Sequence, residues 1–93
     1  MTQHILLKKI GSRTFMPTSL RSGPYRVFFY SGDCDEPSHM HVERDEDKAK
    51  FWLAPVRLES SGGFGRQEIN RIQRILEENE ERLIRSWHEH CPH

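Results

Sequence analysis

Residues 39–53 read HMHVERDEDKAKFWL, and this stretch decides the fold. Apolar and polar residues alternate in its first and last thirds, which is the pattern of strands that bury one face. The acidic residues 45–47 separate the two alternating parts and are typical of a solvent-exposed turn. The stretch therefore predicts a β-hairpin with strands over 39–44 and 48–53.

On the N-terminal side of this hairpin, residues 26–30 (RVFFY) are aromatic and β-branched and predict a further strand. This strand has apolar residues on both faces, so we expect it to be covered on both sides. Glycine, proline and serine interrupt residues 1–24, which we expect to be irregular. Residues 31–38 (SGDCDEPS) are rich in turn formers and predict a loop.

On the C-terminal side, residues 56–59 allow a fourth, short strand, and a flexible connection leads to a helix. Gly65 is the expected N-cap, with Phe64 and Ile69 in the positions of a hydrophobic staple and Glu68 in the first turn. Asn79 lies in an acidic run that interrupts the apolar stripe, so we expect one long helix or two helices with a kink there.

The apolar stripe of this helical segment defines the expected core. Four of its residues should be buried against apolar residues of two strands. These are Ile72, Leu76, Leu83 and Trp87 on the helix, and Val27, Phe29, Phe51 and Leu53 on the strands.

Together these elements predict an α+β fold: a small antiparallel meander of three or four strands, with a C-terminal helix or kinked helix pair packed on one face. The chain has 93 residues, enough for one domain. We assign residues 16–93 to that domain and residues 1–15 to a flexible N-terminal extension.

Composition restricts the class of protein. The 14 basic and 14 acidic residues cancel, so net charge gives no case for a nucleic-acid or membrane binder. No apolar run is long enough for a membrane span and no signal peptide is visible, which favours a cytoplasmic location. Residues 1–32 nevertheless contain five Lys or Arg and no acid. Cys34 and Cys91 are expected to be reduced thiols in that compartment, and nothing in the sequence indicates that they meet.

His39 and His41 are the strongest candidates for chemistry. At alternate positions of a strand their rings lie on one face, opposite the apolar residues, so we expect them to face outward. They could act as a general acid and a general base. They could instead bind a metal with Glu36 or Glu43, or be half-buried structural residues that bond to the backbone or to nearby acids.

Other residues near this strand are candidate ligand contacts. Arg44, Lys48 or Lys50 could balance charge that develops on a phosphate. Trp52 could stack on a base, in a platform with Trp87, Phe28 and Tyr30, although aromatic residues in so small a domain are more often part of its core. Glu36 completes the candidate binding set. The cysteines and C-terminal histidines match no usual zinc spacing, so we expect no metal and no other cofactor.

A series of residues along the chain resembles the DUF4160 family, a small bacterial family without an established activity. The matching segments are Met16-Pro17-Thr18, the strand ending in Tyr30, EPSHMHV (residues 36–42), AKFWL (residues 49–53), Phe64, EEN (residues 77–79) and Trp87-His88. The resemblance implies that the domain begins at Met16. The genes of members often lie beside the gene of a second small protein, which implies a neighbouring-gene partner in a pair similar to toxin–antitoxin systems.

The functional expectation is therefore a small bacterial cytosolic binding module, one half of a two-protein regulatory pair. One alternative is a metal-independent endoribonuclease that uses His39 and His41, with RNA as its substrate. Another is a transcriptional regulator, although no basic recognition helix is visible. The sequence does not decide whether the protein is an enzyme, nor its oligomeric state.

Overall fold

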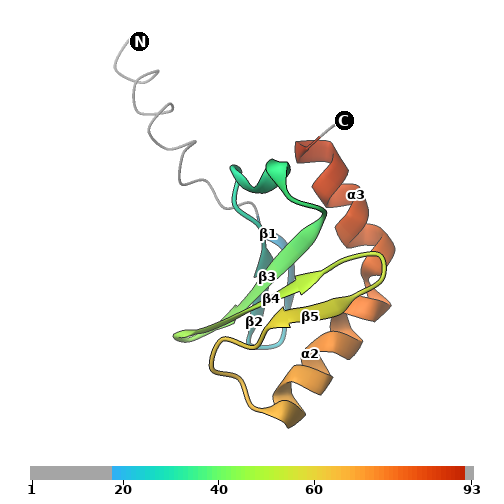
Figure 1. Ribbon diagram of the computed structural model, residues 1–93. Coiled ribbons are helices and arrows are strands. Elements are labelled where there is room, and N and C mark those ends of the chain that lie inside the picture. The colour runs from blue at the N-terminus through green and yellow to red at the C-terminus, as the bar shows by residue number, and fades with distance from the viewer. Residues whose placement is uncertain (1–17, 92–93) are drawn as a thin grey trace, which may run out of the picture.

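The computed structural model describes residues 18–91, and these contain five strands in one antiparallel meander, followed by two helices (Figure 1). The α+β class is confirmed, whereas the expected strand number of three or four is wrong. The strands are β1 (Thr18–Ser22), β2 (Tyr25–Phe28), β3 (His39–Arg44), β4 (Asp47–Trp52) and β5 (Arg57–Ser60). A short 3-10 turn, η1 (Asp33–Asp35), precedes β3, and the helices are α2 (Arg66–Glu78) and α3 (Glu80–His90). The expected extension, residues 1–15, lies outside the described residues.

Strand β1 lies in the segment that we expected to be irregular, and this expectation is wrong. It pairs with β2, with Leu20 opposite Val27, and Gly23 makes the intervening turn at φ +56°. Leu20 is the only buried residue of β1, so the local sequence carries almost no alternation. The strand forms because β2 offers a free edge to which its backbone can bond.

The helical segment begins where the sequence predicts and divides at Asn79. Gly65 is the extended N-cap, and the N–H of Ile69 donates to its carbonyl at 2.9 Å. The side chain of Asn79 donates to the carbonyl of Ile75 at 2.8 Å, while its own carbonyl accepts from the N–H of Leu83. Asn79 therefore ends α2 and starts α3, which confirms the kinked pair.

The two helices cover one face of the sheet (Figure 1). All eight residues predicted to form the core are buried in a single apolar cluster, and Trp87 is only 2% exposed. Phe28 is also fully buried but lies outside this cluster, on the other face of the sheet. No helix among residues 18–91 has both the length and the apolar character needed to span a membrane.

Candidate functional site

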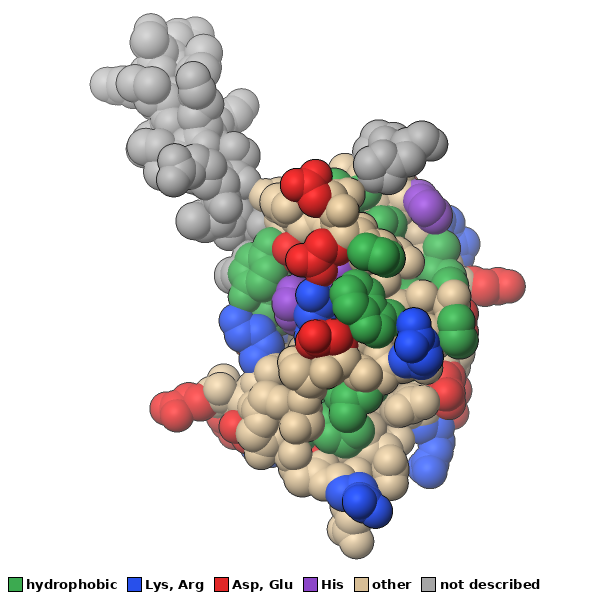
Figure 2. Space-filling view, in the orientation of Figure 1, with side chains coloured by type: hydrophobic (Ala, Val, Ile, Leu, Met, Phe, Trp, Pro, Cys, Tyr) green, Lys and Arg blue, Asp and Glu red, His purple; other side chains and the backbone are tan. Residues whose placement is uncertain are grey.

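Side chains on the sheet face opposite the helices form the candidate site, and we call this surface the open face. Strand alternation places them there: in the register, His41 of β3 lies opposite Phe28 of β2 and Lys50 of β4. The open face comprises Arg26, Phe28, His39, His41, Glu43, Lys48, Lys50, Trp52 and Arg57. Figure 2 shows histidine surface bordered by acidic, basic and apolar side chains.

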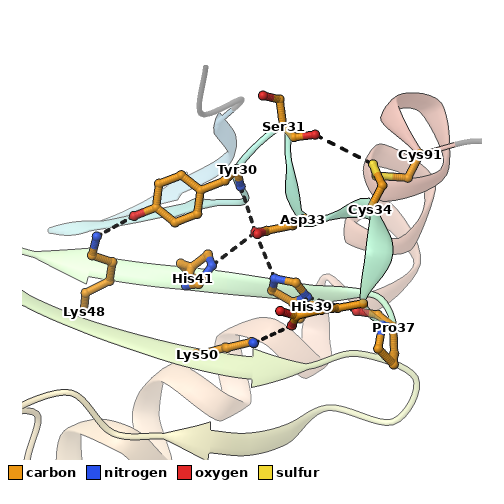
Figure 3. Close-up of polar contacts among 11 residues, drawn as sticks. Tyr30, Ser31, Asp33, Cys34, Pro37, His39, His41, Lys48, Lys50 and Cys91 are labelled. Atoms are coloured by element: carbon orange, nitrogen blue, oxygen red, sulfur yellow. Dashed lines mark hydrogen bonds and ion pairs between the residues drawn. A yellow bond between two sulfur atoms is a disulfide. The ribbon is translucent and has the colours of Figure 1, made fainter. Parts of the chain in front are cut away.

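The carboxylate of Asp33 is the centre of this site (Figure 3). Its Oδ2 atom accepts a hydrogen bond from the backbone N–H of Tyr30 at 3.0 Å. The same oxygen lies 2.9 Å from Nε2 of His39 and 3.3 Å from Nε2 of His41. Turn η1 thus places one acid against both histidines of β3.

His39 lies on the predicted face of β3, but it does not face outward. It is completely buried, because its ring packs against Trp87 at 5.0 Å and Trp52 at 5.8 Å, measured between ring centroids. Its Nδ1 lies 2.9 Å from the carbonyl of Pro37, which can only accept a hydrogen bond. Its Nε2 lies against the Asp33 carboxylate, so both ring nitrogens of His39 are engaged in hydrogen bonds within the protein.

The two other members of the cluster titrate below their usual range. Burial alone would raise the pKa of Asp33, but the hydrogen bonds from Tyr30 and His39 outweigh it and lower the pKa. Burial lowers the pKa of His41, and the charge on His39 lowers it further, against the opposing effect of Asp33. His41 is therefore neutral near pH 7, and its Nε2–H donates a hydrogen bond to the Asp33 carboxylate.

Neutral His41 retains a free proton acceptor. Its Nδ1 has no hydrogen-bond partner among residues 18–91, and no buried side-chain nitrogen or oxygen there lacks one, so solvent reaches Nδ1. The ring contacts Tyr30 at 4.9 Å and Phe28 at 5.5 Å. Beside it, Nζ of Lys48 donates to the Tyr30 hydroxyl at 2.5 Å.

Three of the four predicted binding residues lie close to His39. Lys50 donates to Glu36 at 2.6 Å, and this bond lowers the pKa of Glu36. The Lys50 ammonium also lies 4.7 Å from the Trp52 ring centroid, and Trp52 is paired with His39 in the register. The structure therefore assembles Glu36, Lys50 and Trp52 at one end of the open face.

Arg44, the fourth predicted binding residue, lies on the helix side of the sheet. Its guanidinium donates to both carboxylate oxygens of Glu68 at 2.7 and 2.8 Å, and Glu68 also accepts from the Tyr25 hydroxyl. The assignment of Arg44 to the site is not supported, because residue 44 is an odd step along β3 from His39 and His41. Its bidentate pair connects β3 to the first turn of α2.

Sequence reasoning missed Asp33, and it was wrong to expect reduced cysteines. Cys34 and Cys91 form a disulfide that ties η1 to the end of α3, so they are not free thiols. The signal for Asp33 was an acid in the turn that precedes a strand with two histidines. That signal is weak, because Asp35 and Glu36 lie in the same loop.

Comparison with known proteins identifies a family and nothing closer. No curated protein and no solved structure is significantly similar to the chain. The family described as a domain of unknown function (DUF4160) matches residues 25–88, which is more than half of the sequence. This match includes every strand of the open face and both helices up to His88. The chain belongs to the DUF4160 family.

Proposed function

We propose that this domain is a binding module whose ligand is single-stranded RNA, held on the open face. The observation that carries the proposal is the combination of accessible aromatic rings and basic side chains around His41. Single-stranded nucleic acid is bound in this way elsewhere, with bases stacked on aromatic rings and phosphates against Lys or Arg.

Two rings are placed to stack on bases. Tyr30 and Trp52 are both partly exposed, on either side of the histidine pair. The Tyr30 ring is supported edge-on by buried Phe28 at 5.4 Å, and Trp52 is held against His39. Rings held by their neighbours lose little conformational entropy on binding, which favours stacking.

The basic groups are placed to contact phosphate. Lys48 is exposed and donates to the Tyr30 hydroxyl, and its ammonium makes no ion pair with an acid among residues 18–91. Arg26 and Lys50 pair with acids at the surface, where such pairs contribute little and can exchange for phosphate. In the sequence, residues 1–17 add three basic and no acidic residues.

Binding is favoured over the alternative in which His39 and His41 cleave RNA as an acid–base pair. That mechanism needs two histidines that reach the substrate. His39 is buried with both ring nitrogens bonded, so of the two histidines only His41 can reach an RNA substrate. No observation among residues 18–91 supports the alternative of a transcriptional regulator.

Fluorescence anisotropy with a labelled single-stranded RNA of about a dozen nucleotides tests the proposal. We expect Trp52→Ala to weaken binding about tenfold or more, since a stacked base contributes about 1–3 kcal/mol. Lys48→Ala should also weaken binding and reduce its salt dependence. Arg74→Ala, on the exposed side of α2, is the matched control and should bind like wild type.

Three other outcomes would contradict RNA binding as the function. One is the absence of binding at low salt, and another is equal affinity in wild type, Trp52→Ala and Lys48→Ala. The third is co-purification with a neighbouring-gene protein that is lost in Trp52→Ala, which would assign the open face to the protein partner of a two-protein pair. Cleavage of the RNA that depends on His41 would instead favour the ribonuclease.

A further inference from the structure

We infer that Asp33, His39 and His41 form a binding site for a divalent transition-metal ion such as Zn²⁺. This inference is independent of the proposed RNA binding. Two imidazole nitrogens and one carboxylate oxygen are ligands that Zn²⁺ and its neighbours in the first transition series favour. The sequence suggested a metal bound by His39 and His41 only as an alternative, with Glu36 or Glu43 as the third ligand, and it did not identify Asp33.

The distances between the ligand atoms suit such an ion. Asp33, His39 and His41 each offer one ligand atom, and these three atoms lie within 4.8 Å of one another. The Asp33 oxygen lies 2.9 and 3.3 Å from the two Nε2 atoms. Ligands on tetrahedral Zn²⁺ are about 3.3 Å apart, because each lies about 2.0–2.1 Å from the ion. The two distances from the Asp33 oxygen are close to this value, and rotation of the two rings would bring their ligand nitrogens together from a separation of at most 4.8 Å.

Hydrogen bonds outside the three ligands hold them in the orientation that a metal requires. The Nδ1–H of His39 donates to the carbonyl of Pro37, which leaves Nε2 as the atom that faces Asp33. Metal-bound histidines commonly have this second bond to a carbonyl, and ligating carboxylates are commonly hydrogen-bonded as well. The backbone N–H of Tyr30 supplies that bond to Asp33.

One of the two nearby lysine charges is balanced by an acid, which reduces its repulsion of a bound cation. The Lys50 ammonium is paired with Glu36, whose carboxylate lies 3.8 Å from Nδ1 of His39. The disulfide at Cys34 ties the turn that bears Asp33 to α3, so this ligand is held in place. The ion would displace the Nε2 protons that both histidines direct at Asp33: the proton of His39 would be released to solvent, and that of His41 would move to its free Nδ1.

One position of the site remains open. His41 and Asp33 keep 14% and 18% of their side chains exposed, so solvent reaches this side of the cluster. Three protein ligands with access to water are the arrangement of metal sites that bind an exchangeable fourth ligand. A water molecule would take this position in the protein alone.

Isothermal titration with Zn²⁺ alone, on the full chain with its disulfide intact and no thiol reductant, tests the site. We expect one ion per chain, and at least tenfold weaker binding in His41→Gln and in Asp33→Asn. Zn²⁺ should raise the melting temperature of wild type and not that of these two variants. Co²⁺ should give a visible absorption band that His41→Gln lacks. Circular dichroism checks that both variants fold.

His88→Gln is the matched control, because His88 is an exposed histidine on α3 away from the cluster. It should bind Zn²⁺ like wild type. The inference is overturned if wild type shows no saturable binding at one equivalent, or if affinity is unchanged in both cluster variants. It is also overturned if His88→Gln loses affinity as His41→Gln does, since the ion then binds the C-terminal histidines.

Discussion

Cys34 and Cys91 are joined by a disulfide across 57 residues of sequence, with their Cα atoms 5.4 Å apart. Cys34 follows Asp33 directly, and Cys91 follows the last residue of α3. The bond therefore connects the turn that supplies the central carboxylate of the site to α3, the helix whose Trp87 packs against His39. Stability and the geometry of the site are coupled through this one link.

Removing the disulfide should destabilise the domain. For a loop of this length the chain-entropy relation gives about 4 kcal/mol, a large part of the stability of a small domain. Urea unfolding of the Cys34→Ser/Cys91→Ser double variant measures the loss. Reductant should lower the stability of wild type by a similar amount and leave the variant unchanged. Two free thiols in the untreated wild-type protein would contradict the disulfide.

Leu76→Ala should lower the free energy of unfolding by about 2–5 kcal/mol. Leu76 is fully buried in the core cluster, so the shorter side chain leaves a cavity between α2 and the sheet. Thermal unfolding followed by circular dichroism at 222 nm measures the loss. Arg74→Ala, an exposed change two residues earlier on the same helix, should leave the melting temperature almost unchanged. A Leu76→Ala variant as stable as wild type would mean that α2 does not pack here.

Gly62→Ala should disrupt the connection between β5 and α2. Gly62 has φ +56°, and an added Cβ would lie 1.7 Å from the carbonyl oxygen of Lys48 in β4. The left-handed backbone alone costs about 1–3 kcal/mol in a non-glycine residue, and the clash must also displace a strand. Gly32→Ala is the control, since its Cβ would meet no atom within 4 Å. Equal unfolding midpoints for the two variants would show that β4 and this turn are not in contact.

The contact between α2 and β3 should depend on pH. Hydrogen bonds from Arg44 and then from Tyr25 lower the pKa of Glu68 below its usual 4.5. A carboxylate whose pKa is lower in the folded state stabilises the fold above its unfolded pKa, and this contribution is lost as pH falls through the folded value. Wild type should therefore be more stable than Glu68→Gln at pH 7.

The difference in unfolding free energy between wild type and Glu68→Gln should shrink steadily below about pH 4.5. Urea titrations of both proteins from pH 7 to pH 3 measure it. Glu89→Gln, an exposed change on α3, should follow wild type over the whole range. A constant difference at all pH values would show that the stabilisation does not depend on the charge of Glu68.

Local patterns of the sequence were sufficient to predict the strands and helices that bury one face. The alternation in residues 39–53 predicted β3 and β4 within one residue, because side chains of period two must separate apolar from polar faces. Phe64, Gly65 and Ile69 marked the start of α2 for a similar reason, since a staple and its cap lie within one helical turn. The same patterns placed Leu76 and Trp87 in the core.

Tertiary structure decided the features that depend on contacts between distant segments. Strand β1 exists because β2 has an edge to pair with, and His39 is buried because η1 and Trp87 cover a face that alternation alone would leave to solvent. The disulfide depends on the path of the whole chain between its cysteines. Asp33 could not be distinguished from neighbouring acids until folding brought its oxygen to both histidines, because residue type and spacing in a loop do not specify direction.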